Sequence, residues 1–384
     1  MFTLDFPYEG KKGATTKGGA GSCIMQLSDA LHQRGIDVAV IAGKHSDYKR
    51  EMVDYKVHRV PNIFFGFRES KALGSVFMLL KSFVMPNDFD IVHAHNPPGF
   101  LASYAFAKRI GTPLVLTMHG PWADLRQKAK PIARFIEKNS LSRVDAITAD
   151  SYALKCHLEK QYKIKGIEAI QNAIETDVFK PGPKKDAASA RKRLGIPKDK
   201  FVVLYTGRFV REKHLDDLLN TLPSIIPHAK DVLYLLVGGG FDQKLVDDWM
   251  AANKGFHQYI KIIPFMPPSE MPMLYSASDI FVLPTEAEGM SRSLLEAMAQ
   301  GVPSIVTDIE ANSELINKKR GILYKPGDVW AMSQAIIRLH SNKSLRGRFS
   351  RLSRDHVVAN HSVTARVNEF VSLYNSLLRK NSRR

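Results

Sequence analysis

Short apolar runs separated by helix-like segments constrain the fold of this chain more than any other feature. Eight runs rich in Val, Ile and Leu lie at 38–41, 91–92, 114–117, 146–149, 201–205, 233–237, 280–283 and 304–307. Continuous apolar strands that alternate with helices are typical of parallel sheets covered by helices on both faces. The pattern therefore predicts an α/β protein with doubly wound, Rossmann-like sheets.

A polar segment at 180–200 divides this pattern into two halves. It contains three prolines, a dense mixture of charges and a polar helix predicted over 187–194. Eight strands would also suit a single barrel, but the polar segment at 180–200 favours two domains, and 384 residues are enough for both. We predict one domain over 1–180 and a second over 181–362.

The last segment of the chain carries an apolar stripe with helical spacing, which predicts an amphipathic helix over about 363–384. The stripe consists of Val367, Phe370, Val371, Tyr374, Leu377 and Leu378. An exposed stripe of this size is unfavourable, so the helix must pack on another part of the protein.

The charge is unevenly distributed. The net charge is +17, from 55 basic and 38 acidic residues, and residues 338–384 contain eleven Lys and Arg against Asp355 and Glu369. Three interpretations of this basic segment stay open: a solvated helix face, contact with anionic lipid headgroups, or nucleic-acid binding. The sequence has no zinc-finger, RNP or KH signature, so we expect no nucleic-acid partner.

Composition also bears on the compartment. Cys23 and Cys156 are the two cysteines, which cannot form a disulfide framework or a zinc site. The sequence shows no signal peptide and no apolar run near the roughly 20 residues that span a membrane. We predict a cytoplasmic protein.

The segment at 286–308 is the strongest candidate for a ligand site. It follows an apolar strand, turns through Gly289 and enters a helix around 293–300. Such a junction presents backbone N–H groups and the positive end of a helix dipole to an anion or a sugar hydroxyl. Glu288, at the mouth of the turn, and Glu296, in the helix, are candidate ligand-binding carboxylates; for Glu296 the alternative is a solvated helix residue.

A second candidate segment follows the strand at 201–205. Gly207 makes the turn, and Arg208 and Lys213 flank it before a helix begins. A guanidinium and an ammonium at this spacing suit a diphosphate, and Arg211 would be able to replace either. The glycine-rich loop Lys17–Gly21 precedes a helix and allows close approach of a ligand to the backbone, but it is not a Walker A sequence.

Histidines at strand ends are further candidates. His119 ends the apolar strand at 114–117 and is predicted to face a ligand crevice, with a structural role as the alternative. His93 and His95 invite a metal interpretation, but no further ligand lies at a recognisable offset. We therefore predict no metal site, and we interpret Asp88 and Asp90 as the approach to a strand.

Taken together, and in their order along the chain, these segments resemble a retaining glycosyltransferase of family 4 with a GT-B fold. The resemblance covers nearly the whole chain. The residues that carry the resemblance are Glu288 and Glu296 (Glu, seven residues, Glu), Arg208 and Lys213, the loop Gly18, Gly19, Ala20 and Gly21, the run 118–122, the stretch 172–181 and the glycines 238–240. The resemblance implies two Rossmann-like domains facing each other across a crevice. It also implies that the C-terminal helix crosses back to the N-terminal, acceptor-side domain, and that the C-terminal domain binds the donor.

The resemblance further implies a transfer reaction in which a UDP- or GDP-sugar donates its sugar, with retention and without a metal or other cofactor. The implied donor-binding residues are Gly207, Arg208, Lys213, Gly289, Met290, Ser291, Leu295 and Glu296. Arg208 and Lys213 would stabilise the leaving diphosphate, and Glu288 would hold the 3- and 4-hydroxyls of the sugar. Glu296 would bind the ribose, and His119 would contact the sugar near its 6-hydroxyl.

The acceptor stays open among a glycan, a lipid-linked sugar and a small molecule. Ser291 and His214 stand where the family often has glycine, and the stretch before the glycine loop is longer than usual. The alternative functions are a nucleotide-sugar epimerase of the same fold and, less favoured, a basic nucleic-acid-binding protein.

Peripheral attachment to the inner face of an anionic membrane is a further hypothesis. It rests on the basic C-terminal segment and on the apolar run Ile63–Phe67. In the following helix we interpret Val76, Phe77, Leu80 and Val84 as ordinary core residues.

Overall fold

The computed structural model describes residues 1–10, 13–15, 19–45, 47–61, 64–65, 68–69, 71–121, 130–240, 242–264 and 266–382. The chain divides into two compact units, 1–172 with 363–384 and 173–362. The first boundary lies eight residues before the predicted one, because 173–180 packs within the second unit. There the backbone N–H of Ile174 donates to the carbonyl of His361 (2.9 Å).

The first unit is built on a seven-stranded parallel sheet. Its order is β12 (Ile167–Ala169), β11 (Ala146–Ala149), β10 (Leu114–Met118), β9 (Val92–His95), β1 (Phe2–Thr3), β4 (Ala39–Lys44) and β6 (Lys56–Pro61). Two smaller antiparallel sheets contain β2 (Tyr8–Gly10), β3 (Gly13–Thr15) and β5 (Tyr48–Arg50), and β7 (Phe64–Phe65) and β8 (Arg68–Glu69).

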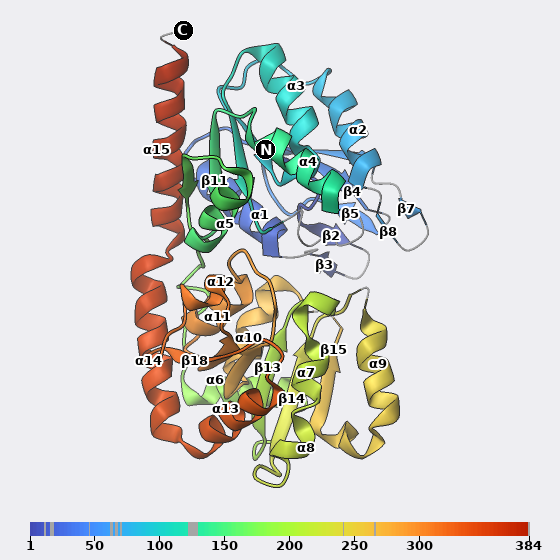
Figure 1. Cartoon of the computed structure of the whole chain (residues 1–384), viewed down its shortest axis with the longest axis vertical. Coiled ribbons are helices and arrows are strands. Elements are labelled where there is room, and N and C mark those ends of the chain that lie inside the picture. Colours follow the sequence, from blue (N-terminus) through green and yellow to red (C-terminus); the bar gives the residue numbers. More distant parts are fainter. Residues whose placement is uncertain are drawn as a thin grey trace. The chain divides into compact units, whose positions relative to one another are not determined.

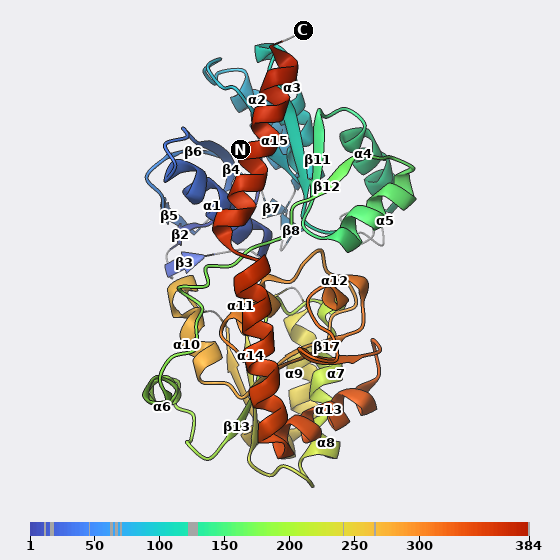
Figure 2. The same cartoon turned by 90° about the vertical axis from the view of Figure 1, so that its left-hand side faces the viewer.

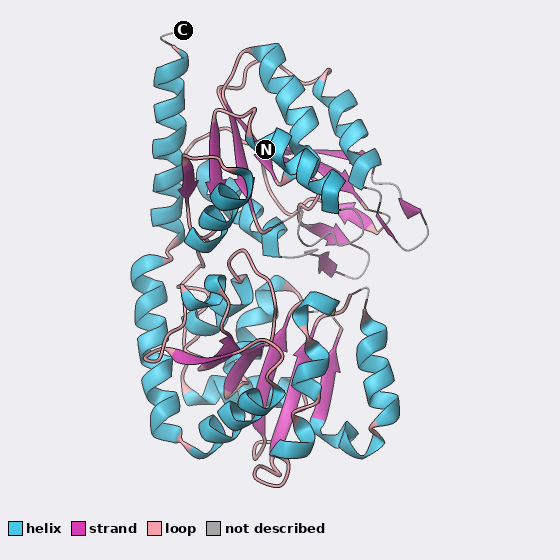
Figure 3. Cartoon of the chain, in the orientation of Figure 1, coloured by secondary structure: helices cyan, strands magenta, loops and turns pink. Residues whose placement is uncertain are grey.

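Helices cover both faces of this sheet (Figure 1, Figure 3). One face packs on α2 (Lys71–Ser82), α3 (Phe100–Ile110), α4 (Lys130–Leu141) and α5 (Tyr152–Tyr162). The other packs on α1 (Gly19–His32) and α15 (Val363–Asn381). A short 3-10 helix, η1 (Pro97–Gly99), joins β9 to α3.

The C-terminal helix α15 lies along the first unit, as predicted (Figure 2). Its residues Val367, Phe370 and Leu377 are buried against α1 residues Leu27 and Leu31. The Tyr374 hydroxyl is also hydrogen-bonded to the Nδ1 atom of His93 on β9 (2.7 Å). The apolar stripe seen in the sequence therefore fixes the return of the chain to its first unit.

The interpretation of the helix after residue 70 as ordinary core is wrong for most of the residues on which it rested. Phe77 packs on the core of the first unit, but Val76, Leu80 and Val84 are exposed. Of the apolar run at 63–67, residues 63, 66 and 67 lie outside the described residues, and only the backbone is described for Phe64 and Phe65.

The second unit contains a six-stranded parallel sheet (Figure 3). Its order is β15 (Ile260–Ile263), β14 (Val232–Val237), β13 (Phe201–Thr206), β16 (Ile280–Leu283), β17 (Ser304–Thr307) and β18 (Gly321–Tyr324). The central strands β13, β14, β16 and β17 are buried along their whole length. Each of the eight predicted apolar runs overlaps a strand of one of the two large sheets.

The second unit's helices surround its sheet (Figure 1). They are α6 (Lys184–Arg193), α7 (Leu215–Leu219), α8 (Leu222–Ile225), α9 (Gln243–Ala252), α10 (Met271–Ser276), α11 (Arg292–Ala299), α12 (Glu310–Ser313), α13 (Val329–Ser341) and α14 (Lys343–Asn360), with 3-10 helices η3 (Arg211–Lys213), η4 (Lys254–Tyr259) and η5 (Pro268–Glu270). The polar helix predicted over 187–194 is α6. Among the residues that the structure describes, no helix is both long enough and apolar enough to cross a membrane.

Candidate functional site

Two neighbouring strands of the second unit bring the predicted donor residues together. β13 and β16 are paired in parallel, so the segments that follow them leave the same edge of the sheet. At that edge the Nζ atom of Lys213 forms a salt bridge with the Oε1 atom of Glu288. The side chains keep only 12% and 14% of their surface exposed, so water screens this ion pair weakly.

Two hydrogen bonds to the Glu212 carbonyl hold these segments together. The Thr285 hydroxyl donates to the carbonyl of Glu212 (3.0 Å), and the backbone N–H of Glu286 donates to the same carbonyl (3.1 Å). The loop that carries Glu288 is thereby fixed to η3, the 3-10 helix that carries Lys213. The salt bridge thus joins two segments that these hydrogen bonds already hold side by side.

Arg208 lies in the turn after β13 and is exposed. Its carbonyl accepts a hydrogen bond from the Tyr205 hydroxyl (2.9 Å), which fixes the backbone of the turn. Within the described part of the chain, no carboxylate is paired with its guanidinium. This cation is therefore available to an anionic ligand.

Glycines of the run 238–240, directly after β14, allow this turn to pack closely against them. A Cβ atom on Gly238 would lie 1.9 Å from the Gly207 carbonyl oxygen, and one on Gly240 would lie 2.3 Å from that of Phe209. Real Cβ atoms do not approach so closely, so any larger residue would displace the turn that carries Arg208. These glycines therefore have a packing role in placing the candidate site.

Helix α11 begins at the predicted turn. Ser291 is its N-cap, and its hydroxyl accepts a hydrogen bond from the backbone N–H of Leu294 (3.3 Å). A serine at this position satisfies one of the free N–H groups of the first turn, which explains why glycine is not required here. Gly289 and Met290 precede it and are buried, as is Leu295 inside the helix.

Glu296 is buried on α11 rather than solvated. Its Oε2 atom lies 2.9 Å from the Tyr275 hydroxyl, and its Oε1 atom accepts a hydrogen bond from the Nε atom of Arg292 (3.0 Å). Burial raises the pKa of Glu296, whereas the charge of Arg292 and the two hydrogen bonds oppose that rise. Arg292 also pairs with Glu175 (3.1 Å). Any ligand hydroxyl would therefore join a carboxylate whose two oxygens already have partners.

His214, which follows Lys213, adopts the left-handed backbone conformation (φ 45°, ψ 45°). A side chain costs about 1–2 kcal/mol in this conformation, so it favours glycine. The Nε2 atom of His214 lies 3.1 Å from the Oε2 atom of Glu286, and Nδ1 lies 3.5 Å from Oδ2 of Asp217. The side chain thus adds a further link between η3 and the Glu288 loop.

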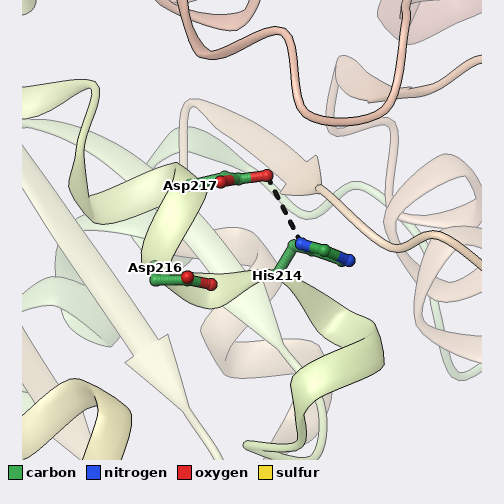
Figure 4. Close-up of side chains that lie close together, drawn as sticks. All are labelled: His214, Asp216 and Asp217. Carbon is green, nitrogen blue, oxygen red and sulfur yellow. Dashed lines mark ion pairs between the residues drawn. The ribbon is translucent and has the colours of Figure 1, made fainter.

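The same segment contains a group of side chains with ligand atoms close enough to hold a cation. Among the described residues it is the one group of this kind. Figure 4 shows His214, Asp216 and Asp217, whose ligand atoms lie within 4.8 Å of one another. Burial raises the pKa of Asp217, and the neighbouring charge of Asp216 raises it further. Both imidazole nitrogens of His214 already face carboxylates. The cluster is accounted for by these contacts and does not itself indicate a metal.

In the first unit, His119 belongs to a chain of buried polar groups. Its Nδ1 atom lies 2.9 Å from the Oδ2 atom of Asp150, and its Nε2 atom lies 3.0 Å from the Nδ1 atom of His95. Only 2% of its side chain is exposed. Asp150 also accepts a hydrogen bond from Asn172 (2.9 Å). The imidazole is therefore held in one orientation by two protein partners.

The two histidines of β9, His93 and His95, are part of the same cluster. Burial lowers the pKa of both His93 and His95 well below the ordinary value of 6.5. The Nε2 atom of His93 lies 2.6 Å from the Thr117 hydroxyl. These contacts support a structural role for the pair.

The glycine loop is described only in part, because Gly18 lies outside the described residues, as does Trp122 of the run 118–122. Gly19, Ala20 and Gly21 form the first turn of α1. A Cβ atom on Gly21 would lie 2.6 Å from the carbonyl oxygen of Asp5, so glycine is required there by packing within the unit.

Several residues of this arrangement were not predicted as site residues. Tyr275 and Arg292 hold Glu296, Glu286 holds His214, and Asp150 holds His119. Arg292 lies four residues before Glu296, a spacing that places both on one helix face and was readable in the sequence. The other three come from distant segments, and only the fold brings them to their partners.

Comparison with known proteins gives the family. A sequence profile described as "Glycosyl transferases group 1" matches residues 186–356, and one described as "Glycosyltransferase Family 4" matches residues 17–178. The chain belongs to the group 1 glycosyltransferases. The two matched regions account for most of both units of this glycosyltransferase.

Two curated relatives illustrate the range of the family. The glycosyltransferase is 30% identical, over 65% of its chain, to a Bacillus subtilis glycosyltransferase named for teichuronic acid biosynthesis, TuaC, and this match covers 61% of TuaC. It is 26% identical, over 80% of its chain and 79% of the relative, to an Escherichia coli enzyme named UDP-Gal:alpha-D-GlcNAc-diphosphoundecaprenol alpha-1,3-galactosyltransferase.

Solved structures confirm the GT-B fold. Sucrose-phosphate synthase from Thermosynechococcus elongatus matches with a TM-score of 0.85 at 20% identity, over 99% of both chains. Anabaena HepE in complex with UDP-glucose matches with a TM-score of 0.79 at 19% identity, over 98% of this chain and 100% of HepE. Both likenesses extend over the whole length of the glycosyltransferase.

Proposed function

We propose that this glycosyltransferase transfers a sugar from a nucleotide-diphosphate sugar, UDP- or GDP-linked, to a glycan, lipid-linked or small-molecule acceptor, with retention and without a metal. The observation that carries the proposal is the edge where β13 and β16 end. There the exposed cation Arg208 and the weakly screened Lys213–Glu288 pair lie beside the N-terminus of α11. The UDP-glucose complex of HepE and the UDP-Gal donor in the name of the E. coli relative support a uridine nucleotide.

The chemistry of the leaving group explains these charges. When the bond between the anomeric carbon and the phosphate oxygen breaks, negative charge develops on the diphosphate and positive charge on the sugar. Fixed cations that face the diphosphate lower the energy of this transition state. Arg208 and Lys213 would supply them, so the reaction would need no metal.

Glu288 would then have two roles. In the salt bridge it neutralises Lys213 and holds its ammonium in place. With donor bound, its carboxylate would accept hydrogen bonds from the 3- and 4-hydroxyls of the sugar. The ammonium of Lys213 would then also interact with the phosphate. The backbone amides of Gly289, Met290 and Ser291 would add N–H donors beside the helix N-terminus.

The remaining groups would position the two ends of the donor. Glu296, held by Tyr275 and Arg292, would accept hydrogen bonds from the ribose hydroxyls through the remaining lone pairs of its carboxylate. His119 would contact the sugar near its 6-hydroxyl. Because both its nitrogens have protein partners, this contact would require its bond to His95 to be exchanged for one to the sugar.

Retention in this proposal follows a front-face transfer. The bond from the anomeric carbon to the phosphate oxygen breaks, and a bond to the acceptor oxygen forms on the same face. The leaving phosphate oxygen takes the proton of the acceptor hydroxyl, and the nucleoside diphosphate departs.

The test is a screen of UDP-, GDP- and ADP-sugars for binding, followed by turnover with candidate acceptors. We expect saturable binding of one nucleotide class and release of its diphosphate that depends on acceptor. NMR of the product should show the anomeric configuration of the donor. Interconversion of sugars without transfer would indicate an epimerase, and an inverted product would refute the front-face route.

A further inference from the structure

Helix α4 of the first unit is turned with its apolar side outward. Its buried positions are Ala133, Glu137, Ser140 and Leu141, which include a carboxylate and a hydroxyl. Its exposed positions include Ile132 and Phe135, at 67% and 68% exposure, and Ile136. A helix that packs on a core normally does the reverse, so the outer face of α4 indicates contact with something apolar.

The neighbouring helices extend this exposed apolar surface. Helices α4 and α2 both contact η1, and α2 also packs on α3. Of the fifteen large hydrophobic residues that are exposed in the described parts of the chain, eight lie in or next to these three helices. They are Val76, Leu80, Phe83, Val84, Leu101, Ile132, Phe135 and Ile136, and we call them, with the exposed cations of the same helices, the outer helix surface.

The exposed charges of the three helices have one sign, whereas the loop after Val84 carries the exposed acids Asp88 and Asp90. Helices α2, α3 and α4 contain seven Lys and Arg residues and a single acidic residue, Glu137, which is buried. Lys108 on α3 and Lys138 on α4 are exposed. Arg109 on α3 is exposed too, and its guanidinium donates to the carbonyls of Phe83 and Met85 (2.7 and 2.8 Å). Exposed apolar side chains therefore lie among cations, and none of the three helices presents a carboxylate to solvent.

We propose that the outer helix surface docks this glycosyltransferase on an anionic lipid bilayer. Aromatic and aliphatic side chains enter the boundary between headgroups and acyl chains, and cations beside them bind the headgroup phosphates. A second copy of the chain is a poorer partner, because pairing the same face twice would bring two sets of cations together. Nucleic acid would satisfy the cations but leave the Ile, Leu, Val and Phe side chains unused.

This inference deepens the proposed function and rests on it, because a surface-bound enzyme would meet a lipid-linked acceptor at the membrane. It also moves the expected contact from the basic C-terminal segment to the first unit's helices. Part of the C-terminal charge has internal partners: Arg354 donates to the carbonyls of Phe179 and Thr176 (2.8 and 3.1 Å), and Arg346 to that of His340 (2.8 Å).

The experiment is co-sedimentation of the full-length protein with vesicles of phosphatidylcholine alone and of phosphatidylcholine with phosphatidylglycerol, at low and high salt. We expect binding to the anionic vesicles that weakens with salt. Ile132→Ser/Phe135→Ser should lower the partition coefficient about ten-fold, because two apolar anchors are lost. Lys108→Glu/Lys138→Glu should lower it by at least about 25-fold, since each surface cation contributes about five-fold.

Matched controls separate this surface from general effects. Trp330→Ser removes a side chain of similar exposure (72%) from α13, and Lys343→Glu/Arg348→Glu reverses two exposed cations on α14. Both should bind vesicles like the wild type. All four variants change exposed side chains, so circular dichroism and melting temperature should match those of the wild type. Phe135→Trp should also show quenching of its fluorescence by brominated lipids.

Three results would overturn the proposal: no binding of the wild type to anionic vesicles at low salt, equal binding of the surface and control variants, or a wild-type dimer that Ile132→Ser/Phe135→Ser converts to a monomer. The last result would assign the surface to a contact between copies. Donor turnover on a water-soluble acceptor, measured without vesicles, tests the proposed function separately. Turnover without vesicle binding refutes only the docking, and vesicle binding without turnover of any nucleotide sugar refutes only the proposed function.

Discussion

The Lys213–Glu288 salt bridge makes the most quantitative prediction for the proposed activity. Lys213→Ala removes a cation from the leaving group, and Glu288→Gln keeps the shape of the side chain but removes its charge. Loss of one electrostatic group that acts on a transition state costs about 10²–10³ in rate. We expect each single variant to lose turnover by this factor while remaining folded.

The same pair predicts a coupling in stability. Removing one partner of a fully buried ion pair costs about 3–5 kcal/mol, because the other charge is left without a counter-charge. Lys213 and Glu288 keep 12% and 14% of their side-chain surface exposed, so we expect a smaller loss of about 1–3 kcal/mol in each single variant. The double variant leaves no unpaired charge and should be more stable than the sum of the two losses predicts.

The assay combines urea unfolding with initial rates of diphosphate release for the wild type, both single variants and the double variant. Lys244→Ala is the control, because its salt bridge with Asp248 is exposed and should affect neither stability nor turnover. Losses that simply add, in both stability and the logarithm of the rate, would show that the two residues act independently. Near-full activity in either single variant would refute the assignment of these residues to the donor.

Three further predictions follow from other parts of the structure. Chelator treatment should leave transfer intact; activity lost in chelator and restored by manganese or magnesium would show that the cluster around His214 or another site holds a required metal. Phe370→Ala should lower the free energy of unfolding of the first unit by about 3–5 kcal/mol, and removal of all residues after Ser362 should destabilise that unit more; melting curves like the wild type would contradict the packing of α15. Stability should fall as the pH drops below about 6.5, because His93 and His95 have lowered pKa values in the fold and take up protons only on unfolding. Urea titrations at several pH values measure this slope, and His95→Gln should reduce it.

The sequence was sufficient to predict the two parallel sheets, because their central strands are buried on both faces and so appear as continuous apolar runs. Five strands of these sheets were not predicted: the two-residue central strand β1 and the edge strands β6, β12, β15 and β18. β15 is half-buried along its length and contains Lys261, and β18 begins with a glycine and is half-buried at its two central positions, so neither has the pattern of a fully buried strand.

The site was predictable to the extent that strand ends determine it. Residues that follow parallel strands leave the sheet at one edge, so Lys213 and Glu288 were expected at the same place before their salt bridge was seen. The contacts that hold them could not be predicted from the sequence, because Thr285 and Glu286 donate hydrogen bonds to the backbone carbonyl of Glu212, and such bonds leave no side-chain pattern. The partner of His119 was hidden in the same way, because Asp150 follows a different strand.

Two helices show what sequence periodicity does not predict. Helices α15 and α4 both have an apolar side, and periodicity reveals such a side without revealing what it faces. In α15 the stripe that contains Phe370 packs on α1, whereas in α4 Phe135 points outward and Glu137 lies inside. The position of the single acidic residue separates the two cases. The outer side of α4, where Phe135 is exposed together with Lys138, is unfavourable in water, and an anionic bilayer is a surrounding in which that outer side is stable.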